Sequence, residues 1–239
     1  MPRESSPLIS RSWPLRRRLA LALDVDSETK ALALANELAE WFGVAKVGYE
    51  LYAAAGPGVV EKLKLLDLEV FLDLKLHDIP TTVGKGATVL GRLGLGYLNF
   101  HAAGGDAMLR AGVEGLAAGA DSAGVSRALA LAVTVLTSDP PDPAVLADRV
   151  DIARGAGCDG VVCGAPDLAA VRERFPDAVT MVPGIRAASA GSDDQVRIAT
   201  PFEALSGGAD VIVVGRTVTA APDRGAAARE LVASLSRLG

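Results

Sequence analysis

Short apolar runs alternate with longer amphipathic segments along most of the chain. The short runs are rich in Val, Leu and Ala, as expected for buried parallel strands, and the longer segments repeat their apolar residues with the period of a helix. We predict strands at residues 19–24, 45–48, 69–75, 97–101, 128–136, 159–163, 179–182 and 210–214. The predicted helices lie at residues 27–41, 58–66, 81–93, 107–116, 143–154, 167–175, 201–205 and 217–238.

Strand and helix follow one another eight times without a break in composition. Strict alternation implies a parallel sheet, and eight such units imply a closed (β/α)8 TIM barrel. An open doubly wound sheet is the alternative, but no GxGxxG follows the first predicted strand to support it. We therefore expect one barrel domain at residues 17–239, preceded by a polar N-terminal tail at residues 1–16.

The apolar run at residues 19–23 is too short for the hydrophobic region of a signal peptide, because Asp24 ends it. No stretch approaches the ~18 apolar residues that span a bilayer. Cys158 and Cys163 lack the spacing of a zinc site or a disulfide framework, and we expect reduced thiols in a cytoplasmic protein. The net charge of -5 disfavours nucleic-acid binding, which depends on phosphate neutralisation, but it allows a small anionic ligand.

Polar and charged residues stand at the ends of the predicted strands. They are Asp24, Lys46, Gly48, Asp73, Lys75, Asp78, Asn99, His101, Thr137, Ser138, Arg186 and Arg216. In a (β/α)8 barrel these strand ends meet at one face, where the active site lies. An ordinary solvated rim is the alternative, but Asp73 and Lys75 lie inside an apolar strand. The sequence therefore predicts a catalytic site at this face.

Asp73 and Lys75 are two residues apart on a strand, so both side chains point to the same side. Lys46 on the neighbouring strand could pair with Asp73, which gives an alternating array of Lys46, Asp73, Lys75 and Asp78. The carboxylates would keep Lys75 protonated. Its ammonium group could then protonate a carbanion, while Asp73 favours the departure of a substrate carboxylate as CO2. The array predicts a decarboxylase.

The loops after the last two strands predict a phosphate site, which is a common position in this fold. Gly184 and Gly215 allow close approach of the backbone, and Arg186 and Arg216 supply charge and forked donors. Gln195, in the polar loop after Gly184, could close over the phosphate. The alternative is that both arginines form ordinary surface ion pairs.

A set of ordered motifs extends this interpretation. They are Leu21-Ala22-Leu23-Asp24, Lys46-Val47-Gly48, Asp73-Leu74-Lys75-Leu76-His77-Asp78-Ile79-Pro80, His101-Ala102-Ala103-Gly104, Leu136-Thr137-Ser138, Pro183-Gly184-Ile185-Arg186, Asp193-Asp194-Gln195 and Val214-Gly215-Arg216. In this order the set resembles the orotidine 5'-monophosphate decarboxylase family. A lone DxKxxD is less specific, because related phosphosugar barrels share it. The resemblance implies conversion of orotidine 5'-monophosphate to uridine 5'-monophosphate in pyrimidine biosynthesis, without a metal or an organic cofactor.

The resemblance also implies a role for each charged residue of the array. Lys75 would protonate C6 of the pyrimidine, and Asp73 would lie against the leaving carboxylate. Lys46 would contact the ribose hydroxyls and hold Asp73. Asp24 would bind the ribose or the pyrimidine.

The other matched residues would bind the substrate or serve the partner subunit. The phosphate would be held by Arg186, Gln195, Gly215 and Arg216. The pyrimidine edge would be read by Thr137 and Ser138, and Pro183 is a further expected substrate-binding residue. The site of a neighbouring subunit would be reached by Asp78, Ile79 and Thr82. The resemblance thus implies a homodimer in which Asp78 is a catalytic residue of the partner's site.

Two other functions stay open at this point. A Mg2+-dependent phosphosugar synthase or decarboxylase of the same superfamily would share the carboxylates of the third strand, but Lys46 and Lys75 would repel a divalent ion. A barrel kept as a non-catalytic subunit is the second alternative. Such a scaffold has no reason to keep buried charges, because their desolvation costs free energy.

Overall fold

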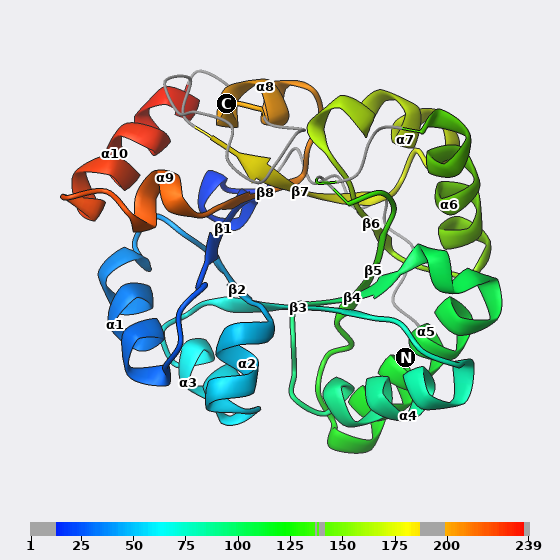
Figure 1. The fold of residues 1–239 in the computed structure, drawn as a ribbon. Helices are drawn as coiled ribbons and strands as arrows, with labels where there is room; N and C mark the ends of the chain where they lie inside the picture. Colours follow the sequence, from blue (N-terminus) through cyan, green and yellow to red (C-terminus); the bar gives the residue numbers. More distant parts are fainter. Residues whose placement is uncertain (1–12, 137, 139–141, 187–198, 237–239) are drawn as a thin grey trace.

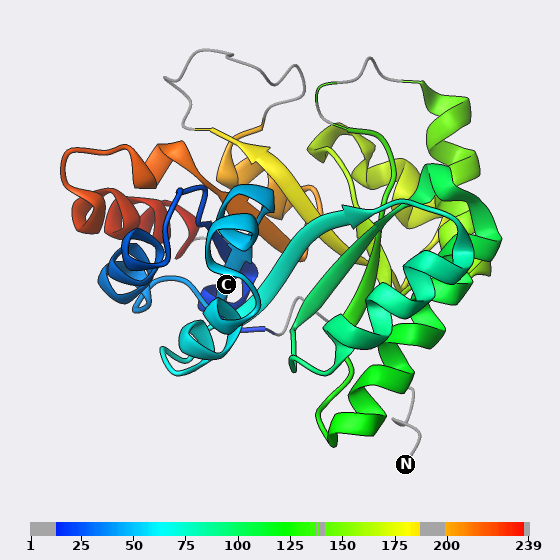
Figure 2. The same ribbon diagram turned by 60° about the horizontal axis from the view of Figure 1, so that its bottom comes forward.

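Eight parallel strands form a closed barrel in the computed structural model, which describes residues 13–136, 138, 142–186 and 199–236. Each strand pairs with the next along the chain, and β8 pairs with β1. Figure 1 looks along the barrel, with the strands at the centre and the helices around them. Figure 2 tilts the barrel so that the strands are seen lengthwise. The predicted (β/α)8 barrel is confirmed.

The observed elements follow the predicted order. The strands are β1 (Leu19–Ala22), β2 (Val44–Val47), β3 (Glu69–Leu76), β4 (Tyr97–His101), β5 (Leu129–Val133), β6 (Gly160–Val162), β7 (Val179–Ile185) and β8 (Val211–Val214). The helices are α1 (Glu28–Leu38), α2 (Tyr49–Ala55), α3 (Gly58–Lys64), α4 (Pro80–Gly91), α5 (Gly105–Ala123), α6 (Pro143–Gly155), α7 (Leu168–Arg174), α8 (Pro201–Ser206), α9 (Arg216–Thr219) and α10 (Arg224–Leu235). Short 3-10 helices lie at Leu15–Arg18, Ala102–Gly104 and Ala165–Asp167.

The number of helices differs from the prediction in two places, and α5 runs to Ala123, beyond its predicted end at residue 116. Helix α2 is absent from the prediction, which has no element between residues 48 and 58. The expected helix at residues 217–238 is divided into α9 and α10. Pro222 lies in the interruption, where it cannot continue a helix, and the carboxylate of Asp223 then caps α10 by accepting the N–H of Ala226 at 2.8 Å. None of the described helices is both long and apolar enough to cross a bilayer.

The strands divide the core into two layers. Successive side chains of β1 alternate, so that Leu19 and Leu21 pack outward against the helices, whereas Ala20 and Ala22 pack inside the barrel. The inner layer also contains Val44, Phe71, Tyr97, Leu131, Val133, Val162, Val179, Met181, Val211 and Val213. These side chains fill the barrel below the strand ends, so the interior is a packed core and not a pore.

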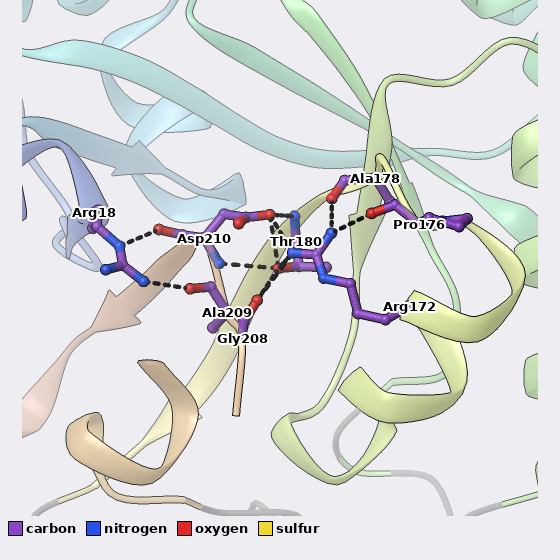
Figure 3. Close-up of polar contacts among 8 residues, drawn as sticks. All are labelled: Arg18, Arg172, Pro176, Ala178, Thr180, Gly208, Ala209 and Asp210. Carbon is purple, nitrogen blue, oxygen red and sulfur yellow. Dashed lines mark hydrogen bonds and ion pairs between the residues drawn. The ribbon is translucent and has the colours of Figure 1, made fainter. Parts of the chain in front are cut away.

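A buried polar network joins β7 and β8 at the end of the barrel where the strands begin (Figure 3). Asp210 is 3% exposed, and its Oδ2 accepts hydrogen bonds from Arg172 Nη2 at 2.8 Å and from the backbone N–H of Thr180 at 2.7 Å. Arg172 also donates to the carbonyl groups of Ala178 at 2.5 Å and Gly208 at 2.9 Å. The charge of this carboxylate is therefore paired and hydrogen-bonded, which is the condition for burying it without a large cost.

The segment before β1 is tied to the same network. Arg18 Nη2 donates to the carbonyl of Ala209 at 2.8 Å, and Arg18 Nε donates to the carbonyl of Asp210 at 3.3 Å (Figure 3). The end of the predicted polar tail contacts the barrel as well. Trp13 packs against the inner core, and Arg16 Nη1 pairs with Asp67 at 2.8 Å.

Helices α4 and α5 pack with their backbones in close contact. A Cβ atom on Gly115 would lie 2.2 Å from the carbonyl oxygen of Gly84, and one on Gly119 would lie 2.1 Å from that of Thr88. Because real Cβ atoms do not approach backbone oxygens this closely, the helices could not pack in this way with larger residues. The contact fixes α4, whose first turn carries Thr82.

We expect Gly119→Ala to lower the free energy of unfolding by about 1–3 kcal/mol, because the added methyl group must push α4 and α5 apart. The matched control is Gly155→Ala at the end of α6, where the nearest atom would lie 3.9 Å away. That change should raise the free energy of unfolding by about 0.4–1 kcal/mol, because alanine restricts the unfolded chain. Urea denaturation measures both, and equal stability of the two variants would contradict the packing argument.

Candidate active site

A cavity of about 420 Å3 opens at the C-terminal ends of the strands. Predicted site residues that line it are Asp24, Lys46, Asp73, Lys75, Pro183, Arg186, Gly215 and Arg216. Apolar side chains cover much of the remaining wall, among them Val133, Val135, Leu136 and Val162. A concave site with an apolar wall and a few convergent charges is the usual form of a small-molecule site.

Four charges form a chain across β1, β2 and β3. Lys46 Nζ donates to Asp24 Oδ1 at 2.8 Å and lies 3.6 Å from Asp73 Oδ2. Lys75 Nζ donates to Asp73 Oδ1 at 2.6 Å. The expected alternation of Lys46, Asp73 and Lys75 is therefore present, and Asp24 extends it at the Lys46 end, whereas Asp78 is not joined to Lys75 within this subunit. The order is Asp24, Lys46, Asp73 and Lys75.

Asp73 is the more buried of the two carboxylates in this array, with 14% of its side chain exposed against 62% for Asp24. Burial acts to raise the pKa of Asp73, but the ammonium groups of Lys46 and Lys75 and the hydrogen bonds from Lys75 and Asn99 act in the opposite direction. The opposing contributions leave the pKa of Asp73 below its ordinary value. Asp73 is thus ionised at neutral pH and holds a negative charge inside the cavity.

The backbone of β3 is irregular where it carries Lys75. The pairing of β3 with β4 shifts register between Leu72 and Leu76. Lys75 lies within this shift and has φ 44°, in the left-handed region. A residue with a side chain costs about 1–2 kcal/mol in this region, so the surrounding contacts must hold it there. Lys75 thus lines the cavity together with Asp73 from a bulged part of the strand.

Asn99 on β4 contacts both catalytic candidates, although no role is predicted for it from the sequence. Its Nδ2 donates to Asp73 Oδ1 at 2.7 Å, and its Oδ1 accepts the backbone N–H of Lys75 at 2.7 Å. Asn99 is fully buried. The signal that could have drawn attention to it is an amide in the middle of the apolar strand Tyr97–His101, because a buried amide requires partners.

The opposite wall of the cavity is basic and rich in glycine. Arg186 follows β7 and Arg216 follows β8, and both line the cavity. Gly184 has φ 80°, a conformation that favours glycine. Arg186 is held in part by the backbone, because its N–H donates to the carbonyl of Ala199 at 3.0 Å. This wall has the charge and the backbone freedom that binding of a phosphate requires.

Some predicted site residues lie away from the cavity. Asp78, Ile79 and Thr82 are exposed beyond the end of β3, and Asp78 Oδ1 accepts the N–H of Ile79 at 2.6 Å. Ser138 is exposed and does not line the cavity. Thr137 and Gln195 lie outside the described residues.

Comparison with known proteins agrees with this geometry. A sequence model described as the orotidine 5'-phosphate decarboxylase / HUMPS family matches residues 17–231. The chain belongs to this family. Orotidine 5'-phosphate decarboxylase of Heliobacterium modesticaldum is 42% identical to it over 92% of this chain and 96% of the relative. The enzyme of the same name from Anaeromyxobacter sp. (strain K) is 44% identical over 91% of this chain and 98% of the relative.

Solved structures lead to the same family. The crystal structure of orotidine 5'-phosphate decarboxylase from Lactobacillus acidophilus has a TM-score of 0.78 and 34% sequence identity, with 92% of this chain and 99% of that chain covered. The resemblance of the ordered motifs to the orotidine 5'-phosphate decarboxylase family is therefore confirmed. Within the described residues of this family member, no three His, Cys, Asp or Glu side chains cluster in a way that could hold a metal ion.

The lowered pKa of Asp73 predicts a pH dependence of stability. Because the folded-state pKa is below the unfolded one, the ionised group stabilises the fold above its unfolded pKa of about 4. That contribution is lost as the pH falls through the lower, folded-state pKa. The free energy of unfolding of the wild-type protein, relative to Asp73→Asn, should therefore be constant above about pH 5 and should fall below about pH 4.

Urea denaturation between about pH 3 and pH 7 measures this difference. The control is Asp151→Asn, which removes an exposed carboxylate paired with Arg174 at 2.6 Å. Solvent screens such a pair, so its removal should have little effect at any of these pH values. Parallel stability curves for the wild-type protein and Asp73→Asn would contradict the assigned ionisation of Asp73.

Proposed function

We propose that this protein is a carboxy-lyase that converts orotidine 5'-phosphate to uridine 5'-phosphate in pyrimidine biosynthesis, without a cofactor. The observation that carries the proposal is the ion pair of Asp73 and Lys75, 2.6 Å apart, in a cavity whose opposite wall carries Arg186 and Arg216. The Asp73 and Lys75 side of the cavity can act on a substrate carboxylate, and the arginine side can hold a phosphate. Membership of the decarboxylase family supports the same assignment.

The charges of Asp73 and Lys75 suit the two steps of the reaction. The carboxylate of Asp73 lies against the substrate carboxylate, and the repulsion between them is relieved as neutral CO2 departs. The bond from C6 to the carboxylate breaks, and its electron pair stays on C6. Lys75 then transfers a proton from its ammonium group to C6, which leaves a neutral amine that regains a proton from water.

The remaining cavity residues would orient the nucleotide. Lys46 and Asp24, paired at 2.8 Å, offer a donor and an acceptor to the ribose hydroxyls. The proposed phosphate ligands are Arg186, Gln195, Gly215 and Arg216, next to Pro183. The proposed ligands of the pyrimidine edge are Thr137 and Ser138. Because a phosphorylated nucleotide is retained inside the cell, we also propose a cytoplasmic location for the protein.

The second part of the proposal is a homodimer that completes each site. Asp78, Ile79 and Thr82 are exposed beyond the C-terminal end of β3, and Ile79 is 66% exposed. Val89, further along α4, is 58% exposed. Exposed apolar side chains on one helix favour contact with another subunit, and a twofold axis would place Asp78 of each subunit at the site of the other.

The two alternatives are less consistent with the site. A Mg2+-dependent phosphosugar enzyme would need a site for the ion beside Asp73, but Lys46 and Lys75 lie 3.6 Å and 2.6 Å from that carboxylate and would repel it. A non-catalytic barrel would gain nothing from a strained residue at Lys75. Backbone strain of this kind clusters at active sites.

We expect Lys75→Ala to abolish decarboxylation, because it removes the proposed proton donor to C6, the ammonium group that lies 2.6 Å from Asp73. Loss of orotidine 5'-phosphate absorbance measures the rate, and calorimetric titration with uridine 5'-phosphate measures nucleotide binding. Binding should largely persist, since the phosphate wall is unchanged. Turnover by Lys75→Ala near the wild-type rate would refute the proposed proton donor.

Two controls accompany that experiment. Lys62→Ala removes an exposed lysine that pairs with Glu28, and it should keep the wild-type rate. Added EDTA should leave the wild-type rate unchanged, whereas loss of activity on chelation would favour the Mg2+-dependent alternative.

The shared site predicts complementation between two inactive variants. Lys75→Ala and Asp78→Ala should each be inactive as homodimers. In a mixed dimer, one site has both mutations and the other has an intact Lys75 with the partner's intact Asp78. After unfolding and refolding of an equal mixture, the activity should return to roughly one quarter of the wild-type value. No recovery in a mixture that refolds to dimers would place Asp78 outside the partner's site.

A further inference from the structure

Asn99 connects the two reacting side chains of the site. We propose that Asn99 is a positioning residue of the decarboxylation: its amide group holds the carboxylate of Asp73 and the backbone of Lys75 in one fixed arrangement. The inference rests on the proposed function. The two hydrogen bonds are both 2.7 Å long, and they fix the orientation of the amide. Its NH2 group must face the carboxylate, which only accepts, and its oxygen must face the N–H of Lys75.

The register shift of β3 explains why the backbone of Lys75 needs a side-chain partner. A bulge removes backbone groups from the regular ladder, and a buried N–H without an acceptor is costly. Asn99 supplies the acceptor for Lys75, and the hydroxyl of Tyr49 donates to the adjacent carbonyl of Leu74. These two side chains replace ladder bonds on either side of one peptide group. They therefore help to hold the left-handed conformation of Lys75, which lines the cavity.

The second hydrogen bond of Asn99 orients the carboxylate. Asp73 Oδ1 receives both Asn99 Nδ2 at 2.7 Å and Lys75 Nζ at 2.6 Å, whereas Lys46 Nζ lies 3.6 Å from Oδ2. Without the amide, Asp73 could rotate to follow either ammonium group. Asn99 does not line the cavity, so it acts on the reaction through its two partners and not through the substrate. Its loss should therefore lower kcat far more than it changes KM.

The first test is Asn99→Leu, which removes both hydrogen bonds and keeps the branching and the number of heavy atoms of the side chain. We expect kcat to fall about 100-fold, because small displacements of reacting groups have effects of this size, while KM stays close to the wild-type value. The matched control is Thr134→Val just after β5. Thr134 is also fully buried, and its hydroxyl donates to the carbonyl of Val162 at 3.2 Å, on β6 and not on the strands that carry Lys46, Asp73 and Lys75. That variant should keep the wild-type kcat.

The second test is Asn99→Asp, which has the same shape and retains an oxygen for the N–H of Lys75. At neutral pH the introduced carboxylate would repel that of Asp73, so kcat should be low. As the pH falls, the introduced carboxyl group would take up a proton and donate it in a hydrogen bond to Asp73, as the amide does in the wild-type protein. We expect the kcat of this variant to rise toward lower pH relative to those of the wild-type protein and Thr134→Val.

The outcomes separate this inference from the proposed function. A wild-type protein without decarboxylase activity would refute the proposed function itself. Active wild-type protein together with an Asn99→Leu kcat equal to that of Thr134→Val would refute only the role of Asn99. If Asn99→Leu does not fold, the pH profile of Asn99→Asp tests the role of Asn99 instead. Binding of uridine 5'-phosphate then checks that Asn99→Asp is folded. A pH profile of Asn99→Asp parallel to that of the wild-type protein would also refute the role.

Discussion

Closure of the barrel brings together residues that lie far apart along the chain, and the remaining features depend on this constraint. Arg18 and Asp210 are 192 residues apart but are joined by a hydrogen bond where β1 meets β8. The consecutive pairing of β1, β2 and β3 lets Asp24, Lys46 and Asp73 form one chain of charges, and closure adds the ends of β7 and β8 to the same cavity. Each strand in such a barrel contributes its last residues to a common face.

The two ends of the barrel use buried charge in different ways. At the N-terminal end, Asp210 is surrounded by donors from Arg172 and Thr180, and the network fixes neighbouring strands. At the C-terminal end, Asp73 is held just as firmly but faces a cavity. The first arrangement satisfies a carboxylate completely within the protein, whereas the second leaves one face of the carboxylate to a ligand. The buried charges that stabilise the fold and those proposed to act on the substrate thus lie at opposite ends of the barrel.

Much of the fold could be predicted from the sequence, because the apolar runs mark the strands and their alternation with helices fixes the class. The grouping of Lys46, Asp73 and Lys75 could also be predicted, since it requires only adjacent strands and a period of two. The hydrogen bonds of Asn99 could not be predicted from the sequence, because they depend on the register of β3 against β4. The conformation of Lys75 was equally hidden, since nothing in the local sequence marks a left-handed lysine. The place of Asp24 beside Lys46 was also not foreseen from the pattern, whereas Asp78, which lies beyond β3, stays a prediction for the partner's site.

The seam between β1 and β8 also has a consequence for biosynthesis. Strand β1 is among the first parts of the barrel to leave the ribosome, and its second partner is among the last. At ~5–20 residues per second, the 192 residues between Arg18 and Asp210 take about 10–40 s to synthesise. During that interval one hydrogen-bonding edge of the apolar strand β1 has no native strand to pair with. The nascent chain must therefore remain protected from wrong pairing until its final strand appears.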